Sequence, residues 1–133
     1  MSRRRYIDTS ALRHLLTESA KTPEIRRIVA AEAIVCASSQ ISITELHRMS
    51  MTTSGISPTE VDDVLDKVDL IALEGAQLRR AGLLPSVPAG AQLRSLDAIH
   101  IQAALDIGAT DFVTCDKKQG KAAKAAGLKV SIL

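Results

Sequence analysis

Short apolar runs alternate with longer helical patterns along this chain, and this alternation is the feature that most constrains its fold. Parallel strands need long crossover connections, which are usually helices that cover both faces of the sheet. We therefore expect an α/β protein with a central parallel sheet of four to five short strands. The expected strands are a first one that ends at residues 6–7, followed by residues 33–37, 70–73, 112–114 and 129–133.

Helix signals fill the stretches between these runs. The clearest is S-P-T-E at residues 57–60, where Ser at the N-cap, Pro at the first position and Glu at the third form a capping box. Ser10 is expected to cap the first helix, and Gly108 and Gly127 to end the last two. The clearest loop covers residues 82–92, which are rich in Pro and Gly. The expected helices cover residues 10–16, 23–31, 42–51, 57–68, 74–83, 94–107 and 117–126.

Composition limits the functions that such a fold could have. The chain has 133 residues, and we expect residues 1–133 to form a single domain. One Tyr, one Phe and no Trp exclude a nucleic-acid interface built on bases stacked over aromatic rings. The net charge of +2 permits contact with a phosphate backbone without requiring it.

Cysteine usage and hydropathy indicate the compartment. Two Cys in apolar surroundings make no disulfide framework and suit a reducing environment. The arginines at residues 3–5 are not followed by an apolar run, so they do not begin a signal peptide. No stretch approaches the roughly 18 apolar residues of a membrane span. We therefore expect a cytoplasmic protein without a membrane partner.

Four carboxylates occupy positions where parallel sheets form their sites, beyond the carboxyl ends of the strands. Asp8 follows the first strand, and Asp116 follows the fourth. Glu45 stands at the start of the helix after the second strand. Asp97 opens the long helix that leads into the fourth strand, and its next neighbours are apolar. The pattern predicts that these four side chains meet at one edge of the sheet.

Such a cluster predicts a divalent cation. Four neighbouring carboxylates cannot all stay ionised without a counter-charge. Mg²⁺ or Mn²⁺ prefers oxygen ligands and keeps several waters, whereas no Cys and His set here has the spacing of a zinc site. A carboxylate-held cation beside a phosphodiester favours hydrolysis by metal-activated water.

Each of these acids also has a purely structural interpretation. Glu45 completes a possible capping box at residues 42–45, and Asp116 could cap a helix together with Gln119. Asp8 could be a turn residue. Asp97 is the hardest to explain structurally, because an unpaired carboxylate on an otherwise apolar helix face is costly to bury.

Other polar residues near these positions are weaker candidates. We expect His100, three residues after Asp97, to pack or cap rather than bind a metal. His14 and His47 are expected at the surface or behind the ligands, and Cys115 lacks a partner base to make it a nucleophile. The remaining group is basic and could be either a solvated face or a guide for an RNA backbone. Its members are Lys117, Lys118, Lys121, Lys124 and Lys129.

Four segments together resemble the motifs of the PIN-domain family, in that family's order. They are Y-I-D-T-S-A-L at residues 6–12, I-T-E-L-H-R at residues 43–48, L-R-S-L-D-A-I-H-I-Q-A-A-L at residues 93–105 and F-V-T-C-D-K-K at residues 112–118. The chain is most similar to the VapC-type ribonuclease toxins of toxin–antitoxin pairs. The resemblance spans residues 6–133 and implies a three-layer α/β/α sandwich.

The resemblance also implies an activity and a site. It implies a Mg²⁺- or Mn²⁺-dependent endoribonuclease, the toxin of a type II toxin–antitoxin pair, whose RNA products carry 5′-phosphate and 3′-hydroxyl ends. Asp8 and Asp97 match the family's most constant metal ligands, and Glu45 and Asp116 would complete the ligand set directly or through water. The small hydroxyl residues that would hold the carboxylates or the substrate are Thr9, Ser10 and Thr114.

The same resemblance implies partners. They are an RNA substrate, which Lys117 and Lys118 would help to bind, a second copy of the chain in a homodimer, and a small cognate antitoxin. The alternative is a non-catalytic PIN-fold module that binds RNA or protein. A phosphoacceptor or phosphatase domain fits poorly, because Ser10 replaces the second acid of a D-x-D motif and Glu74 stands where a receiver domain places its acceptor Asp.

Overall fold

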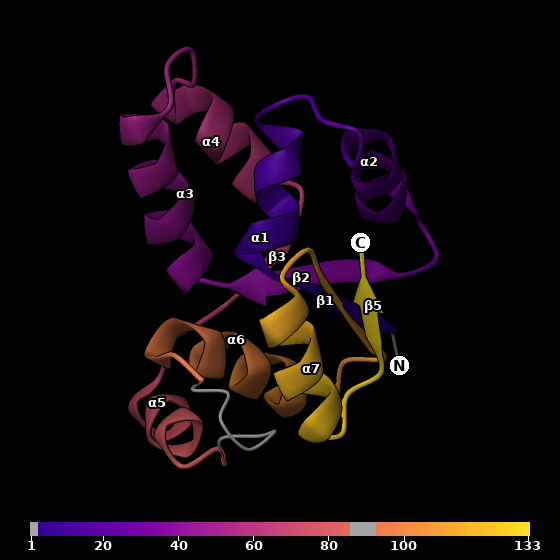
Figure 1. Ribbon diagram of the computed structural model, residues 1–133, viewed down its shortest axis with the longest axis vertical. Coiled ribbons are helices and arrows are strands. Elements are labelled where there is room, and N and C mark those ends of the chain that lie inside the picture. The colour runs from indigo at the N-terminus through magenta and orange to yellow at the C-terminus, as the bar shows by residue number, and fades with distance from the viewer. Residues whose placement is uncertain (1–2, 86–92) are drawn as a thin grey trace.

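Within residues 3–85 and 93–133, which the computed structural model describes, five short strands form one parallel sheet (Figure 1). Their order across the sheet is β3-β2-β1-β4-β5, and every neighbouring pair is parallel. The predicted parallel sheet is therefore confirmed. The strands are Arg4–Ile7 (β1), Val35–Ser39 (β2), Asp69–Ile71 (β3), Asp111–Thr114 (β4) and Val130–Ile132 (β5).

Helices cover both faces of the sheet and complete a three-layer sandwich, as Figure 1 shows. One face carries α1 (Thr9–Leu12), the 3-10 turn η1 (Arg13–Leu15), α2 (Thr22–Ala30), α3 (Ile41–Thr52) and α4 (Pro58–Leu65). The other side carries α5 (Gly75–Gly82), α6 (Ser95–Asp106) and α7 (Lys117–Ala125). In the part of the chain that the structure describes, no helix is long and apolar enough to cross a membrane.

The two central strands, β1 and β4, send alternate side chains into two separate cores. Tyr6 pairs in register with Phe112, and both belong to the core under α6 and α7. Ile7 pairs with Val113, and both belong to the core under α1, α2, α3 and α4. Successive strand residues point to opposite faces, so one register serves both layers. Each such buried side chain contributes roughly 1.5–3 kcal/mol, which holds β1 and β4 side by side.

The second strand lies two residues later than the sequence predicts, because its last residues are polar but buried. Ser38 and Ser39 continue the strand with no exposed surface. The hydroxyl of Ser38 lies 2.8 Å from that of Ser42, and the Ser39 hydroxyl accepts a bond from the Ile41 amide at 3.1 Å. Serines that find partners at the start of the next helix can therefore end a buried strand.

Two of the predicted helix starts differ in the structure. Ser10 does not cap the first helix, because Asp8 occupies the N-cap and accepts a bond from the Ala11 amide. Ser42 lies inside α3, whose N-cap is Gln40, so the possible capping box at residues 42–45 does not form. The capping box at Ser57 is confirmed. The predicted loop at residues 82–92 lies outside the described residues from residue 86 onward.

The strand order places a crevice at the ends of β1 and β4. The chain moves from β1 through β2 to β3 on one side, then continues with β4 and β5 on the other side. Ligands of open α/β sheets bind at such a reversal, beyond the carboxyl ends of the strands. Asp8 directly follows β1, and its amide extends the ladder by donating to the Val113 carbonyl at 3.1 Å. Asp116 follows β4 and begins α7.

Two glycine substitutions test how the helices around this crevice end. Gly127 has a φ of +101° after α7, and a Cβ there would meet no atom within 4 Å. We expect Gly127→Ala to destabilise the protein by about 1–2 kcal/mol through backbone strain alone. Gly82 ends α5 in equally open space, but its backbone is helical. Gly82→Ala should therefore stabilise the protein by about 0.4–1 kcal/mol, because alanine reduces the entropy of the unfolded chain without strain in the fold. Urea denaturation measures both, and shifts in the same direction would show that backbone conformation does not decide these effects.

Candidate active site

All four acids singled out in the sequence line one pocket of about 280 Å³ at the ends of β1 and β4. They come from four places in the fold, namely the end of β1, α3, α6 and the start of α7. The structure therefore gathers side chains that lie up to 108 residues apart in the sequence, from Asp8 to Asp116. The lining residues are Asp8, Thr9, Ser10, Arg13, Glu45, Met49, Asp97, His100 and Asp116.

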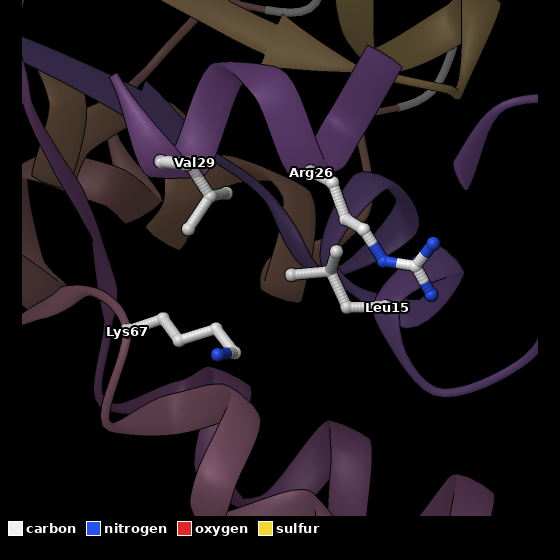
Figure 2. Close-up of a pocket in the computed structure, with 5 residues that line it drawn as sticks. Leu15, Arg26, Val29 and Lys67 are labelled. Carbon is white, nitrogen blue, oxygen red and sulfur yellow. The ribbon is translucent and has the colours of Figure 1, made fainter. Parts of the chain in front are cut away.

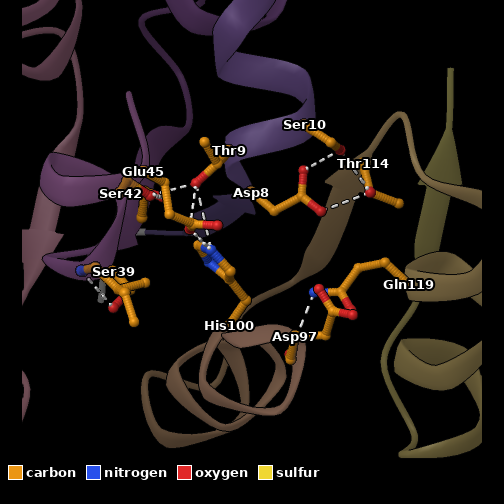
Figure 3. Close-up of polar contacts among 12 residues, drawn as sticks. Asp8, Thr9, Ser10, Ser39, Ser42, Glu45, Asp97, His100, Thr114 and Gln119 are labelled. Atoms are coloured by element: carbon orange, nitrogen blue, oxygen red, sulfur yellow. Dashed lines mark hydrogen bonds and ion pairs between the residues drawn. The ribbon is translucent and has the colours of Figure 1, made fainter. Parts of the chain in front are cut away.

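Asp8 is a buried lining residue of this pocket and is held by hydroxyls, as Figure 3 shows. Its Oδ1 accepts bonds from Ser10 Oγ at 2.6 Å and from the Ala11 amide at 3.2 Å. Its Oδ2 accepts a bond from Thr114 Oγ1 at 2.6 Å. Burial raises the pKa of Asp8, and the charge of His100 and these bonds oppose that effect without cancelling it. Asp8 thus stays fixed in place.

Glu45 lies on α3 and is held on one oxygen. Thr9 Oγ1 donates to Glu45 Oε1 at 2.8 Å, and His100 Nε2 lies 2.7 Å from the same oxygen. Burial acts to raise the pKa of Glu45, but the hydrogen bond and charge of His100 and the bond from Thr9 outweigh it. The Glu45 pKa therefore lies below its ordinary value, and this side chain is ionised at neutral pH.

Asp97 lies in the first turn of α6 and is electrostatically unsatisfied. Among residues 3–85 and 93–133, its carboxylate accepts no hydrogen bond and forms no ion pair. The charges of His100 and Arg94 act to lower its pKa, but they do not outweigh the causes that raise it. Burial raises its pKa, and the nearby charges of Asp116 and Glu45 raise it further. The pocket therefore holds negative charge without enough positive charge to balance it.

Asp116 both lines the pocket and caps α7. Its Oδ1 accepts bonds from the amides of Lys118 at 2.9 Å and Gln119 at 3.3 Å, so the capping interpretation of this residue holds. The reciprocal half of the capping box with Gln119 does not form, because the Asp116 amide donates to Thr114 Oγ1. Oδ2 of Asp116 has no protein partner among the described residues. Gln119 is buried, and its side chain donates to the Asp97 carbonyl at 3.2 Å. That bond joins the starts of α6 and α7 and keeps two acids on one wall.

Two charged or titratable residues line the pocket although the sequence analysis did not assign them to it. His100 lines the pocket, and its spacing of three residues from Asp97 was the available signal. Arg13, an exposed residue of η1, is also among the residues that line the pocket. No motif pointed to Arg13, because its place depends on the 3-10 turn that follows the short α1.

The other histidines and Cys115 do not line the pocket. His14 is not at the surface: it is buried, and its Nδ1 lies 2.7 Å from Ser19 Oγ, which is not among the proposed ligands. His47 of α3 pairs with Asp62 of α4 at 2.9 Å in an exposed contact between the two helices. The lysines of α7, including Lys117 and Lys118, are exposed and do not line the pocket.

A larger hollow of about 490 Å³ lies elsewhere, between η1, α2 and the turn after α4 (Figure 2). Its lining residues are Leu15, Arg26, Val29, Ala30 and Lys67. None of these side chains is a carboxylate, so this hollow lacks the oxygen ligands that a divalent cation prefers. Size alone therefore does not select the active site.

The donor set of the acidic pocket fits a hard divalent cation. Asp97 and Asp116 offer oxygens without protein partners among the described residues. Burial raises the pKa of Asp97 most, and the charges of Asp116 and Glu45, which raise it further, are charges that such an ion would offset. Within the described residues, however, no three His, Cys, Asp or Glu side chains are close enough to hold one ion as they stand. Water in the coordination sphere, which Mg²⁺ keeps readily, is therefore part of this fit.

Comparisons with known proteins agree with this architecture. The family model described as PIN domain matches residues 5–125. A search of curated protein sequences found no match. Among solved structures, the chain is similar to VapC20 of Mycobacterium tuberculosis, a toxin that cleaves the sarcin-ricin loop. The TM-score is 0.72 at 15% identity, over 93% of this chain and 95% of that one.

Two further structures show the same fold. VapBC2 of Rickettsia felis, bound to a DNA fragment from its promoter, gives a TM-score of 0.69 at 14% identity, over 97% of this chain and 98% of that one. FitAcB of Neisseria gonorrhoeae gives 0.64 at 13% identity, over 95% of both chains. At these identities the likeness establishes the fold.

Replacing Asp97 should stabilise the metal-free protein at neutral pH. The raised pKa means that the folded state keeps a proton on Asp97 up to a higher pH than the unfolded chain does. Above that folded pKa the ionised carboxylate costs folding free energy, and Asn removes the cost. We expect Asp97→Asn to unfold at a higher urea concentration than the parent at neutral pH. The difference between the two urea midpoints should shrink as the pH falls through the pKa of Asp97 in the folded state.

The measurement is a series of urea denaturation curves in chelator from neutral to acid pH. Asp63→Asn, at an exposed acid on α4, controls for the loss of one negative charge. A less stable Asp97→Asn at neutral pH, or a gap that widens in acid, would contradict the electrostatic account.

Proposed function

Since this chain belongs to the PIN domain family, we propose that its acidic pocket is the active site of a metal-dependent endoribonuclease. The observation that carries the proposal is the convergence of four carboxylates from four elements on one pocket with uncompensated negative charge. The likeness in fold to a toxin that cleaves the sarcin-ricin loop supports an RNA substrate. The reaction is hydrolysis of a phosphodiester bond.

The cation is Mg²⁺ or Mn²⁺, held by Asp8 and Asp97, with Glu45 and Asp116 as ligands directly or through water. When bound, it would supply an activated water and stabilise charge on the phosphate oxygens. Asp8 is pre-oriented by the hydroxyls of Ser10 and Thr114. Its Oδ1 already accepts two bonds, whereas Oδ2 accepts one and keeps a further lone pair for the ion. Such outer contacts fix a ligand before the ion arrives.

Basic residues around the acids give the RNA backbone a place to bind. Arg13 lies in the pocket, and Lys117 and Lys118 are exposed at the start of α7 beside Asp116. Their charges attract phosphates to a site that would otherwise repel them. The chain's two aromatic residues, Tyr6 and Phe112, are fully buried, so binding through the backbone is the mode that remains.

We propose further that the protein is the toxin of a type II toxin–antitoxin pair and works as a homodimer. The likeness to VapC20 and to VapBC2 supports this assignment. A small cognate antitoxin would be the partner that silences it. Growth arrest on expression, relieved by co-expression of the product of a short adjoining reading frame, tests this partnership.

Removing a proposed metal ligand should abolish cleavage without unfolding the protein. We expect Asp8→Asn and Asp97→Asn to lower kcat on RNA by at least about 100-fold, because each loses a charged ligand. Calorimetric titration with Mn²⁺ should show weaker binding in both variants, and the parent's products should carry 5′-phosphate ends. Asp63→Asn should keep both properties.

The contrary outcome favours a non-catalytic binding module of the same fold. One observation favours that alternative: both oxygens of Asp8 are already bonded, and no three acids among the described residues stand together as a ready-made cluster. A parent protein that binds RNA but neither binds Mn²⁺ nor cleaves would establish the module. Cleavage unchanged in Asp97→Asn would refute the assigned site.

Neutralising the basic groups should weaken RNA binding rather than chemistry. We expect Arg13→Gln and Lys118→Gln each to raise KM several-fold, and to reduce the slope of log affinity against log salt by roughly 0.7, the value for one contact to single-stranded nucleic acid. Arg26→Gln, whose guanidinium pairs with Glu18 away from the pocket, is the control. An unchanged salt slope in Arg13→Gln and Lys118→Gln would remove these residues from the interface.

A further inference from the structure

His100 connects the interior of the protein to the acidic pocket. Its side chain is 3% exposed and lies on α6, one helical turn after Asp97. Nδ1 lies 2.6 Å from the hydroxyl of Tyr6. Nε2 lies 2.7 Å from Glu45 Oε1, and Figure 3 shows His100 beside Glu45. The ring is therefore held from both sides, by one partner in the core and one in the pocket.

The direction of the bond to Glu45 follows from the chemistry of its acceptor. An ionised carboxylate only accepts hydrogen bonds, so Nε2 carries a proton and donates to Oε1. The hydroxyl of Tyr6 can either donate or accept, so it satisfies Nδ1 in both charge states of the ring. The contact between His100 and Glu45 is therefore the same whether the imidazole is neutral or charged.

Tyr6 is itself fixed by aromatic packing. It is fully buried and stacks on Phe112, with ring centroids 5.2 Å apart and an interplanar angle of 10°. It meets the ring of His100 edge-on, with centroids 5.8 Å apart. The chain's one tyrosine and one phenylalanine thus form the support against which the imidazole is held.

Glu45 is held on one oxygen and left free on the other. His100 and Thr9 both bond Oε1, and Oε2 has no protein partner among the residues that the structure describes. The Glu45 side chain is 25% exposed, so its free oxygen can meet a ligand from the pocket. A glutamate without such support rotates about several bonds, and ordering it on ligand binding would cost conformational entropy.

We propose that His100 is a positioning residue that, supported by Tyr6, orients Glu45 for the cation site. The inference rests on the function proposed above and assigns a role to residues that the acidic set does not include. Outer-sphere partners of this kind change metal affinity or activity by about 10-fold to 100-fold when they are removed. His100 itself touches neither cation nor RNA in this role.

Substitutions at one position separate positioning from packing. His100→Asn is too short to reach Glu45 but keeps a polar group near the Tyr6 hydroxyl, whereas His100→Gln can place an amide donor close to the position of Nε2. We expect His100→Asn to weaken Mn²⁺ binding and lower kcat by about 10-fold or more, with KM for RNA unchanged. His100→Gln should recover most of both losses, and Tyr6→Phe should fall between the two.

The control is His47→Asn, which removes a histidine of α3 that pairs with Asp62 and does not line the pocket, and it should leave Mn²⁺ affinity and kcat at the parent values. Calorimetry on RNA-free protein gives the affinity, and circular dichroism checks that each variant is folded. A double-mutant cycle with Glu45→Gln isolates the contact, because His100→Asn should have almost no further effect in that background.

The outcomes distinguish this inference from the proposed function. If the parent binds Mn²⁺ and cleaves RNA, and the His100 variants have the same Mn²⁺ affinity and kcat as the parent, the positioning role is wrong and the proposed function stands. The role is also wrong if His100→Asn weakens Mn²⁺ binding equally with and without the Glu45 carboxylate. If the parent neither binds Mn²⁺ nor cleaves, the proposed function is wrong and the role falls with it.

Discussion

The carboxylate of Asp8 is the group on which the arrangement of the site depends. It caps α1 through the Ala11 amide and accepts hydroxyl bonds from Ser10 on α1 and Thr114 at the end of β4. Because its own amide also donates to Val113, this one residue joins β1, α1 and β4. A buried carboxylate is tolerated here because its oxygens are bonded, which offsets part of the cost of removing it from water.

The two walls of the pocket differ in how strongly they are fixed. The wall formed by Asp8 and Glu45 is bonded through Ser10, Thr9 and His100. The other wall is formed by Asp97, whose carboxylate has no protein partner among the described residues, and Asp116, which uses one oxygen to cap α7. Asp8 and Glu45 are thus held in place, whereas Asp97 and Asp116 are less constrained. This difference suits a site that becomes fully ordered only when a cation offsets the negative charge of the four acids.

Sequence patterns could predict the parts of this structure that depend on local chemistry or on chain topology. The alternation of strands and helices indicated the parallel sheet, and parallel strands bring their ends to one edge, so Asp8 and Asp116 could be placed together from the sequence alone. The capping box at Ser57 could be recognised because all its partners lie within four residues. The motif resemblance added the α/β/α layers.

The features that were missed depend on contacts between distant residues. Serine is a residue type that favours the N-cap position, but Asp8 rather than Ser10 caps α1. The second oxygen of Asp8 accepts a bond from Thr114, which β4 brings close from far along the chain. Glu45 and His100 are 55 residues apart, so no spacing rule could pair them. The role of Tyr6 in supporting that pair requires both the register of β1 with β4 and the path of α6.

The difference in bonding between Asp8 and Asp97 has a consequence for how the sequence can evolve. A lineage no longer selected for catalysis could lose Asp97 without losing any hydrogen bond of its carboxylate. Loss of Asp8 would also remove the cap of α1 and the bond to Thr114 of β4, so inactive descendants should keep Asp8 longer.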